Sequence, residues 1–240
     1  MAAAEPTLTQ QVYDQLRRRL VHGELGARTQ LVNRTIAREL GTSTIPVREA
    51  ISRLASEGLV DYVPGAGAFV RQSDRRELAQ LYDLREALEP LAAAEAARNI
   101  SSYELDEMRS HCDAWDRLCD AVPAKGHATR KQMNEWLDLE ERFHMLLAAA
   151  SRNPWLERSL TGVRLVASVF AAQRTEPALL TAALAKQTCQ EHRDLVQALS
   201  DRDVERARDW MREHIRHGRG VVLAHFDSQP ARPAKRRKGE

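Results

Sequence analysis

The side chains best suited to bind a ligand are one carboxylate and three imidazoles in the second half of the chain. Glu140 and His144 stand four residues apart, so a helix would project both from the same face. His192 and His214 follow in later segments of helical pattern, and apolar residues flank all three histidines. Polar groups in such surroundings are costly to bury without partners. A shared divalent metal ion inside a helical bundle would satisfy all four.

Two other interpretations of these residues stay open. A single histidine on a helix is more typical of a surface position or of a hydrogen-bonded core residue. A metal-dependent enzyme is the rival function, but the chain has no His-Glu-x-x-His run, nucleophile elbow or Gly-rich phosphate loop. We therefore expect no catalytic residues and no enzyme. Three imidazoles with one carboxylate suit zinc, nickel, manganese, cobalt or iron, and the sequence does not choose among them.

A second chemical signal lies in residues 34–70, where a helix with a basic face is expected. Two short segments with apolar residues at helical spacing are separated by Gly41, which fits a left-handed helix cap. The second segment shows Arg48 and Arg53 on its polar face. Residues 59–63 and 68–70 have the pattern of strands around a glycine-rich tip. With a further helix before residue 22, this predicts a winged helix-turn-helix that fits a DNA major groove.

The chain of 240 residues is long enough for two domains, each with a core of its own. It is 43% hydrophobic and 29% charged with few aromatic residues, which is typical of a water-soluble helical protein. No apolar stretch is long enough to span a membrane, and the start lacks the features of a signal peptide. The three cysteines are widely spaced, so we expect free thiols, no disulfide framework and a cytoplasmic location.

The predicted fold class is mainly α. A winged helix-turn-helix of three helices plus a β-hairpin wing precedes an all-α antiparallel bundle of about six helices with short connections. We place the winged domain at residues 1–72, a linker at 73–77, the helical domain at 78–226 and a disordered basic tail at 227–240. The tail has little to bury. It would either add sequence-independent attraction to phosphate or only help keep the chain in solution.

A long motif in the winged domain resembles the GntR family of bacterial transcription regulators: Pro46-Val47-Arg48-Glu49-Ala50-Ile51-Ser52-Arg53-Leu54, followed by Glu57-Gly58-Leu59-Val60. The helical half resembles the FCD-type ligand-binding domain of the FadR subgroup, through stretches such as Phe143-His144 with Ser151-Arg152-Asn153-Pro154. Together the two regions cover nearly all of the chain except its ends. The resemblance implies a regulator that binds double-stranded DNA as a homodimer on a pseudo-palindromic operator. We expect no membrane partner.

The resemblance also suggests which side chains contact the operator. In FadR-like domains, arginines at three motif positions do so, and Arg34 and Arg48 match two of them. Thr44 stands at the third, so we expect an operator that differs from the common family sequence. Arg53 is placed to contact phosphate, or is merely solvated. The wing glycines, Gly65 and Gly67, would let the backbone approach the minor groove, or serve only the turn.

In the helical half, many members of the subgroup bind a divalent metal through an Asp and three His. By position these fall on Glu140, His144, His192 and His214, with Glu140 one methylene longer than the usual Asp. Arg85 is the candidate for gripping the carboxylate of a small organic acid effector, and the alternative is a salt bridge with Glu89. We expect repression that the acid relieves. The alternative function is a regulator for which the metal ion is itself the signal.

Overall fold

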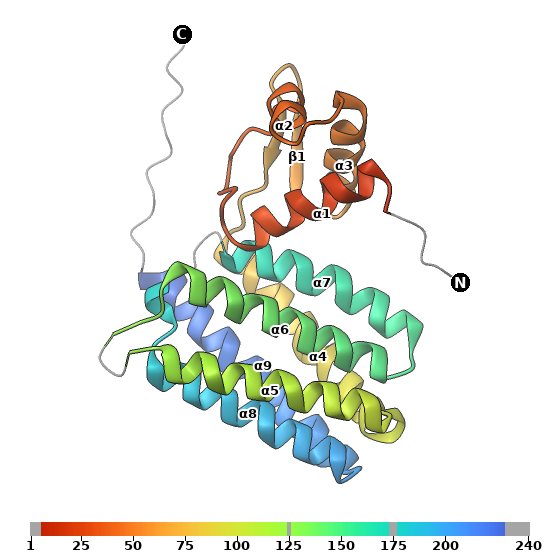
Figure 1. Cartoon of the computed structure of the whole chain (residues 1–240), viewed down its shortest axis with the longest axis vertical. Helices are drawn as coiled ribbons and strands as arrows, with labels where there is room; N and C mark the ends of the chain where they lie inside the picture. The colour runs from red at the N-terminus through yellow and green to blue at the C-terminus, as the bar shows by residue number, and fades with distance from the viewer. Residues whose placement is uncertain (1–5, 124–125, 173–176, 229–240) are drawn as a thin grey trace.

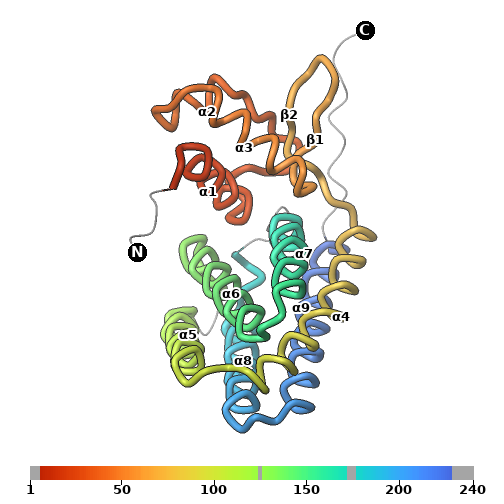
Figure 2. Tube along the Cα trace, turned by 90° about the vertical axis from the view of Figure 1, so that its right-hand side faces the viewer, coloured from red at the N-terminus to blue at the C-terminus, as the bar shows by residue number. Residues whose placement is uncertain are grey.

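The computed structural model describes residues 6–123, 126–172 and 177–228. Within these residues the chain is mainly helical, with one two-stranded antiparallel hairpin, which confirms the predicted fold class (Figure 1). The first three helices and the hairpin form a small unit at one end of the molecule. The remaining helices form a longer bundle, and the two units meet along α1, α6 and α7 (Figure 2).

The small unit is a winged helix-turn-helix. Its elements are α1 (Leu8–Val21), α2 (Asn33–Glu39), α3 (Thr44–Ser56), β1 (Val60–Val63) and β2 (Gly67–Val70). The apolar side chains predicted for α1 and α3 point inward, where Leu16, Val47 and Leu54 are fully buried. Gly41 has a φ of 64°, so it ends α2 in the left-handed conformation that favours glycine. The wing strands pair in register from Val60 opposite Val70 to Val63 opposite Gly67.

The bundle contains α4 (Arg75–Asn99), α5 (Ser102–Ala121), α6 (Arg130–Ala150), α7 (Pro154–Ala172), α8 (Ala182–Ser200) and α9 (Val204–Ser228), with a short 3-10 helix at Pro177–Leu179. Side-chain caps start several of these helices. Ser101 and Glu104 form a capping box at α5, and Thr129 and Gln132 form a second one at α6. Helix α4 continues through Pro90.

Two predicted boundaries shift in the structure. Helix α4 begins at Arg75, inside the segment expected to be a linker, because the Asp74 carboxylate accepts a hydrogen bond from the backbone N–H of Glu77 and caps it. At the other end, α9 includes Asp227 and Ser228, which we had assigned to the tail. The rest of the predicted disordered tail, residues 229–240, lies outside the described residues.

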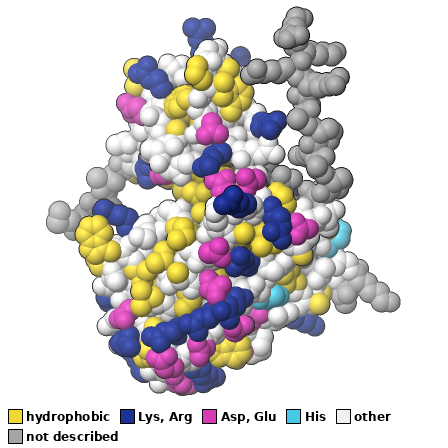
Figure 3. All heavy atoms as spheres, turned by 180° about the vertical axis from the view of Figure 1, so that it is seen from behind, with side chains coloured by type: hydrophobic (Ala, Val, Ile, Leu, Met, Phe, Trp, Pro, Cys, Tyr) yellow, Lys and Arg dark blue, Asp and Glu magenta, His cyan; other side chains and the backbone are white. Residues whose placement is uncertain are grey.

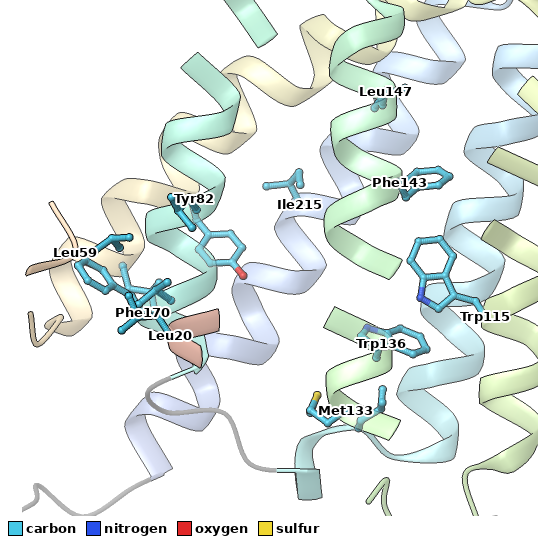
Figure 4. Packing of buried hydrophobic residues seen from close by; sticks show 14 of the residues in the cluster. Leu20, Leu59, Tyr82, Trp115, Met133, Trp136, Phe143, Leu147, Phe170 and Ile215 are labelled. Atoms are coloured by element: carbon cyan, nitrogen blue, oxygen red, sulfur yellow. The ribbon is translucent and has the colours of Figure 1, made fainter. Parts of the chain in front are cut away.

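The two units share one continuous hydrophobic core. Leu20 of α1, Leu59 before β1 and Phe170 of α7 belong to the same buried cluster, and Figure 4 shows these three grouped at one side of the bundle. Polar contacts flank this junction. Arg17 donates to the Glu141 carboxylate at 2.5 Å, and His22 Nε2 lies 2.9 Å from Asp138 Oδ1. Helix α1 is therefore held against α6 and α7 by both burial and charge.

The cysteines depart from the expectation of free thiols. Cys119 of α5 and Cys189 of α8 form a disulfide, whereas Cys112 is a buried free thiol. The two bonded cysteines are 70 residues apart in the sequence. Their pairing depends on how α5 packs against α8, and no local pattern shows that.

On the face of the bundle shown in Figure 3, acidic and basic side chains are intermingled. Ion pairs also join α4 to α9, since Arg216 donates to Glu86 at 2.7 Å and Arg75 donates to Asp227 at 2.6 Å. None of the helices in the described part of the chain is both long and apolar enough to cross a membrane.

Candidate metal centre and DNA-reading surface

The structure brings together the carboxylate and the three imidazoles singled out in the sequence. Glu140 and His144 lie on α6, His192 on α8 and His214 on α9. Each offers one ligand atom, and these four atoms all lie within 4.8 Å of one another. The spacing of four residues places Glu140 and His144 on the same face of α6, as expected. Helices α8 and α9 each contribute one of the other two imidazoles.

The atoms that face the centre of this cluster lack other partners. His144 Nε2 lies 3.4 Å from one Glu140 oxygen, and His192 Nε2 lies 3.6 Å from the other. Among the described residues, Glu140 Oε1 and the Nε2 atoms of both histidines are buried without a hydrogen-bond partner. Buried polar atoms are rarely left in that state. A divalent cation at the centre would satisfy them, so the donor set fits such an ion.

The protonation states also suit a cation. Burial lowers the pKa of the His192 imidazole well below its ordinary value, so this ring is neutral and can offer a lone pair. Trp115 covers the same ring, with the two centroids 3.9 Å apart and the planes 15° from parallel. Burial alone would raise the pKa of Glu140, but in this cluster of imidazoles the pKa lies below its ordinary value, so this side chain is a carboxylate. Neutral imidazole and ionised carboxylate are the ligand forms that a metal requires.

A second layer of carboxylates orients two of the imidazoles. Glu89 of α4 lies 2.6 Å from His144 Nδ1, and Glu191 of α8 lies 2.9 Å from His214 Nδ1. Such contacts favour a proton on Nδ1 and leave Nε2 free for a ligand, which is a common arrangement around metal-binding histidines. Neither Glu89 nor Glu191 is expected in the site from the sequence. Their one local signal was position, since Glu191 precedes His192 and Glu89 stands four residues after Arg85.

Glu89 is also the centre of a buried charge network. Arg164 of α7 donates to both of its oxygens, at 3.0 and 2.9 Å, and Arg85 donates at 2.6 Å. Burial would raise the pKa of Glu89, but Arg164, Arg85 and His144 lower it well below its usual range. Glu89 therefore stays charged although it is only 2% exposed. The salt bridge between Arg85 and Glu89, which was the alternative for Arg85, is present.

A cavity of about 180 Å³ opens beside this cluster. Glu140 and His214 of the cluster line it, together with Arg85 and Arg164. Arg85 thus both pairs with Glu89 and faces the space where a ligand would bind. Its guanidinium also lies over the Tyr82 ring, 4.7 Å from the centroid. The four ligand atoms can hold a cation, and this cation and Arg85 can together bind a small anion in the cavity.

On the winged unit, two of the predicted reader residues are available to an external partner. Arg34 near the start of α2 and Arg48 on α3 are exposed. Within the described residues neither makes an ion pair or hydrogen bond to the chain, as expected for side chains that bind phosphate or base edges. Thr44 is the first residue of α3 and is exposed as well.

The other predicted DNA contacts differ in their surroundings. Arg53 turns back toward α1, where it lies 3.7 Å from the centroid of the Tyr13 ring and donates to Gln10 and Glu57. A phosphate contact by Arg53 would have to compete with these interactions. Gly65 and Gly67 are exposed at the wing tip with φ of 73° and 104°. Both take a backbone conformation that a side chain would strain, so the turn itself requires them.

Comparisons with known proteins agree on one class. The model of bacterial regulatory proteins of the gntR family matches residues 8–70, and the FCD domain model matches residues 80–217. The HTH-type transcriptional repressor RspR of Escherichia coli K12 is 26% identical over 212 residues, covering 87% of this chain and 86% of RspR. The "probable D-xylose utilization operon transcriptional repressor" of Paenarthrobacter nicotinovorans is 28% identical over 210 residues, covering 87% of this chain and 86% of that protein.

Solved structures show the same fold. The structure of McbR/YncC from E. coli has a TM-score of 0.79 at 22% identity and covers 92% of this chain and 99% of its own. A GntR-type regulator from a Rhodococcus species has a TM-score of 0.69 at 18% identity, covering 90% and 97%. The matched families and relatives are transcriptional regulators and not enzymes. The chain therefore belongs to the GntR family of bacterial regulatory proteins, as a DNA-binding transcriptional regulator that carries an FCD domain.

Proposed function

We propose that this chain is a repressor of the FadR subgroup whose affinity for its operator is set by a small organic acid bound beside a divalent metal ion. The observation that carries the proposal is the convergence of Glu140 and three histidines next to a cavity that Arg85 also lines. The ion would be held by Glu140, His144, His192 and His214. It would supply positive charge and open coordination positions to a carboxylate. Its identity within the zinc, nickel, manganese, cobalt and iron group is left open.

We further propose a homodimer that binds double-stranded DNA in the cytoplasm, with one winged unit on each half of a pseudo-palindromic operator. Helix α3 would lie in the major groove with Arg48 toward the bases and Arg34 toward the backbone. Thr44 replaces an arginine of the subgroup, so a guanine reader worth about 1–3 kcal/mol of discrimination would be missing at that position. The wing tip at Gly65 and Gly67 would approach the minor groove.

The contacts between the units suggest how the acid could change DNA affinity. Arg164 and Ser168 of α7 line the cavity, while Phe170 of the same helix packs in the cluster that contains Leu20 of α1. A ligand that favours one position of α7 would thereby favour one position of α1 and of the winged unit. Only a difference in affinity between two arrangements can shift their balance. The acid would therefore favour the arrangement that binds the operator less tightly.

Two variants measured side by side test this function. Metal content by elemental analysis and operator affinity by fluorescence anisotropy are measured on each full-length protein. We expect Arg48→Ala to lose sequence-specific binding and keep its metal. We expect His144→Ala to lose the metal, and operator binding by this variant should no longer respond to acid. Substoichiometric metal that is equal in wild type and His144→Ala would rule out the metal site, and unchanged operator binding by Arg48→Ala would rule out α3 as the reading helix.

A second function, in which the ion itself is the signal, is separable by titration. In that case, adding metal to the metal-free protein changes operator affinity without any organic acid. Under the proposed function, metal alone leaves operator affinity nearly unchanged, and the change appears on adding acid to the metal-loaded protein. The donor set is common to both functions, but the cavity lined by Arg85 beside the cluster favours the acid.

A further inference from the structure

The cavity beside the Glu140 cluster has two chemically different ends. Arg164 of α7, Glu140 of α6 and His214 of α9 mark one end. The same helices also line the cavity with apolar side chains further along their axes. Met133 comes seven residues before Glu140 on α6, Ala171 seven residues after Arg164 on α7, and Val222 eight residues after His214 on α9. Seven residues of helix correspond to about 10.5 Å along its axis. A ligand that reaches from the cation toward the N-terminus of α6 and the C-termini of α7 and α9 therefore passes from polar to hydrocarbon surroundings.

The apolar end is lined from several elements. Its side chains are Met133, Trp136, Leu179, Leu180, Leu184 and Val222. Among the described lining residues, the charged groups belong to the other end, where Arg85, Glu140, Arg164 and Glu191 lie. The lining also includes the hydroxyl-bearing side chains of Tyr82, Ser168 and Thr188, but no further cationic side chain of Lys or Arg among the described residues. A second carboxylate placed against the apolar side chains would lose its water without gaining an opposite charge, and a ligand with several hydroxyls would lose more hydration than these few groups replace, which is unfavourable.

The charges at the polar end leave room for a single negative charge. Arg85 and Arg164 are balanced by Glu89 and Glu140, with Glu89 bonded to both arginines. Glu191 faces His214 and His217 at 2.9 and 2.8 Å. With a divalent ion present, Glu191 offsets one of its two charges, so one positive charge remains. A monoanion would neutralise it, whereas a dianion would leave a buried charge without compensation.

The cavity is partly open to solvent, so its volume indicates how much of a ligand it can enclose. A cavity of about 150 Å³ holds one benzene molecule. The cavity here is about 180 Å³. The enclosed part therefore has room for about one small ring or a short branched chain beside the carboxylate.

We infer that the effector is a compact monocarboxylic acid with a hydrocarbon body, and not a sugar acid or a dicarboxylic acid. This inference rests on the proposed function, because it assigns the carboxylate to the end of the cavity where the ion would be held. The hydrocarbon body lies against Leu184 and Val222. The selectivity comes from desolvation, since the apolar end rejects any group that needs water.

Four probes of similar size test the inference by isothermal titration calorimetry on zinc-loaded, full-length protein. Benzoate has the predicted chemistry, benzamide lacks the charge, threonate replaces the ring with hydroxyls and succinate carries a second carboxylate. We expect benzoate to bind at least about tenfold more tightly than each of the other three, which corresponds to about 1.4 kcal/mol. Threonate or succinate binding as tightly as benzoate would overturn the inference and leave the proposed acid-responsive function standing. Binding of none of the acids would overturn both.

Variants at the apolar end provide the second test. Val222→Thr keeps the side-chain shape and adds a hydroxyl, and Leu184→Gln adds an amide, so each should weaken benzoate binding about tenfold. Leu223→Gln is the matched control, because Leu223 is a partly buried residue of α9 that does not line the cavity. Its benzoate affinity should equal that of wild type, and all three variants should keep their zinc. Wild-type benzoate affinity in both cavity variants would overturn the inference, and a thermal melt without ligand checks that each is folded.

Discussion

Glu89 is the residue on which the buried charges of the helical domain converge. It lies 2.6 Å from His144 Nδ1 and accepts hydrogen bonds from Arg85 and Arg164. Removing its charge would deprive two buried guanidinium groups of the carboxylate to which they are hydrogen-bonded, which costs far more than a lost surface ion pair. Glu89 therefore links the stability of the bundle to the position of one candidate metal ligand.

We expect Glu89→Gln to weaken zinc binding about 10–100-fold, as changes to the outer partners of metal ligands do. The same variant should lower the free energy of unfolding by about 3–5 kcal/mol, because Arg85 and Arg164 lose their buried partner. Competition with a zinc indicator and urea denaturation measure the two effects. Glu191→Gln is the matched control, since Glu191 also contacts a histidine Nδ1 but bonds no arginine among the described residues. It should weaken zinc binding without the same loss of stability. A Glu89→Gln protein with wild-type zinc affinity would exclude the positioning role.

The four candidate ligands could be found from the sequence, whereas their partners could not. Glu140 and His144 show themselves by a spacing of four residues, and apolar neighbours mark the histidines on the other helices. Arg164 lies 75 residues from Glu89, and their pairing depends on how α7 packs against α4. Periodicity specifies which face of a helix is buried but not which helix covers it. The same reason hid the pairing of Cys119 with Cys189.

At the scale of elements, helical periodicity and caps predicted most of the fold. Leu16, Val47 and Leu54 are buried, as the helical spacing of apolar residues requires, and Gly41 ends a helix as expected. The errors lie at boundaries, such as the start of α4, where a side-chain cap extends a helix into a predicted linker. The contact of α1 with α6 and α7 had no sequence signal, because its ion pairs join residues more than 100 positions apart.

This contact makes a prediction about coupling. Arg17→Gln removes the bond from α1 to Glu141, so we expect the acid to change operator affinity by a smaller factor than in wild type, with metal content unchanged. Operator affinity is measured with and without benzoate on the zinc-loaded protein. Arg18→Gln is the matched control, because Arg18 is the next residue, is exposed and makes no ion pair among the described residues. An unchanged response in Arg17→Gln would show that α6 does not carry the coupling.

A second element-scale prediction concerns acid stability. Glu104 at the start of α5 accepts bonds from Arg152 and Ser101, and these outweigh its burial and lower its pKa to about 2. A carboxyl with a lowered pKa in the folded state stabilises above its ordinary pKa, and this contribution is lost as the pH falls toward 2. The expected contribution is about 1 kcal/mol, because Arg152 is half exposed and water screens the pair. Urea denaturation at pH 7 and pH 3 should show a smaller loss in Glu104→Gln than in wild type, and equal losses would contradict this.

At the scale of the whole molecule, the arrangement of the two units sets how DNA can be read. One winged unit presents one α3 helix, which spans only half of a typical operator. The winged unit is also fixed to the bundle by the continuous core and by the α1 contacts, so it is not free to reorient independently. If two bundles associate, the two α3 helices are held at a set separation and angle. The distance between the two half-sites of the operator then reports the separation of the two α3 helices in the dimer.

The proposed homodimer therefore predicts a strict dependence on the distance between half-sites. Inserting about five base pairs at the centre of the operator rotates one half-site by about half a turn of DNA, so the second α3 helix faces away from its groove. We expect affinity to fall to that of a single half-site, as measured by anisotropy with the stoichiometry fixed by analytical ultracentrifugation. Replacing the central base pairs without changing their number is the control and should have little effect. Equal affinity for the normal and lengthened operators would mean that each chain binds DNA independently, and the dimer proposal would fail.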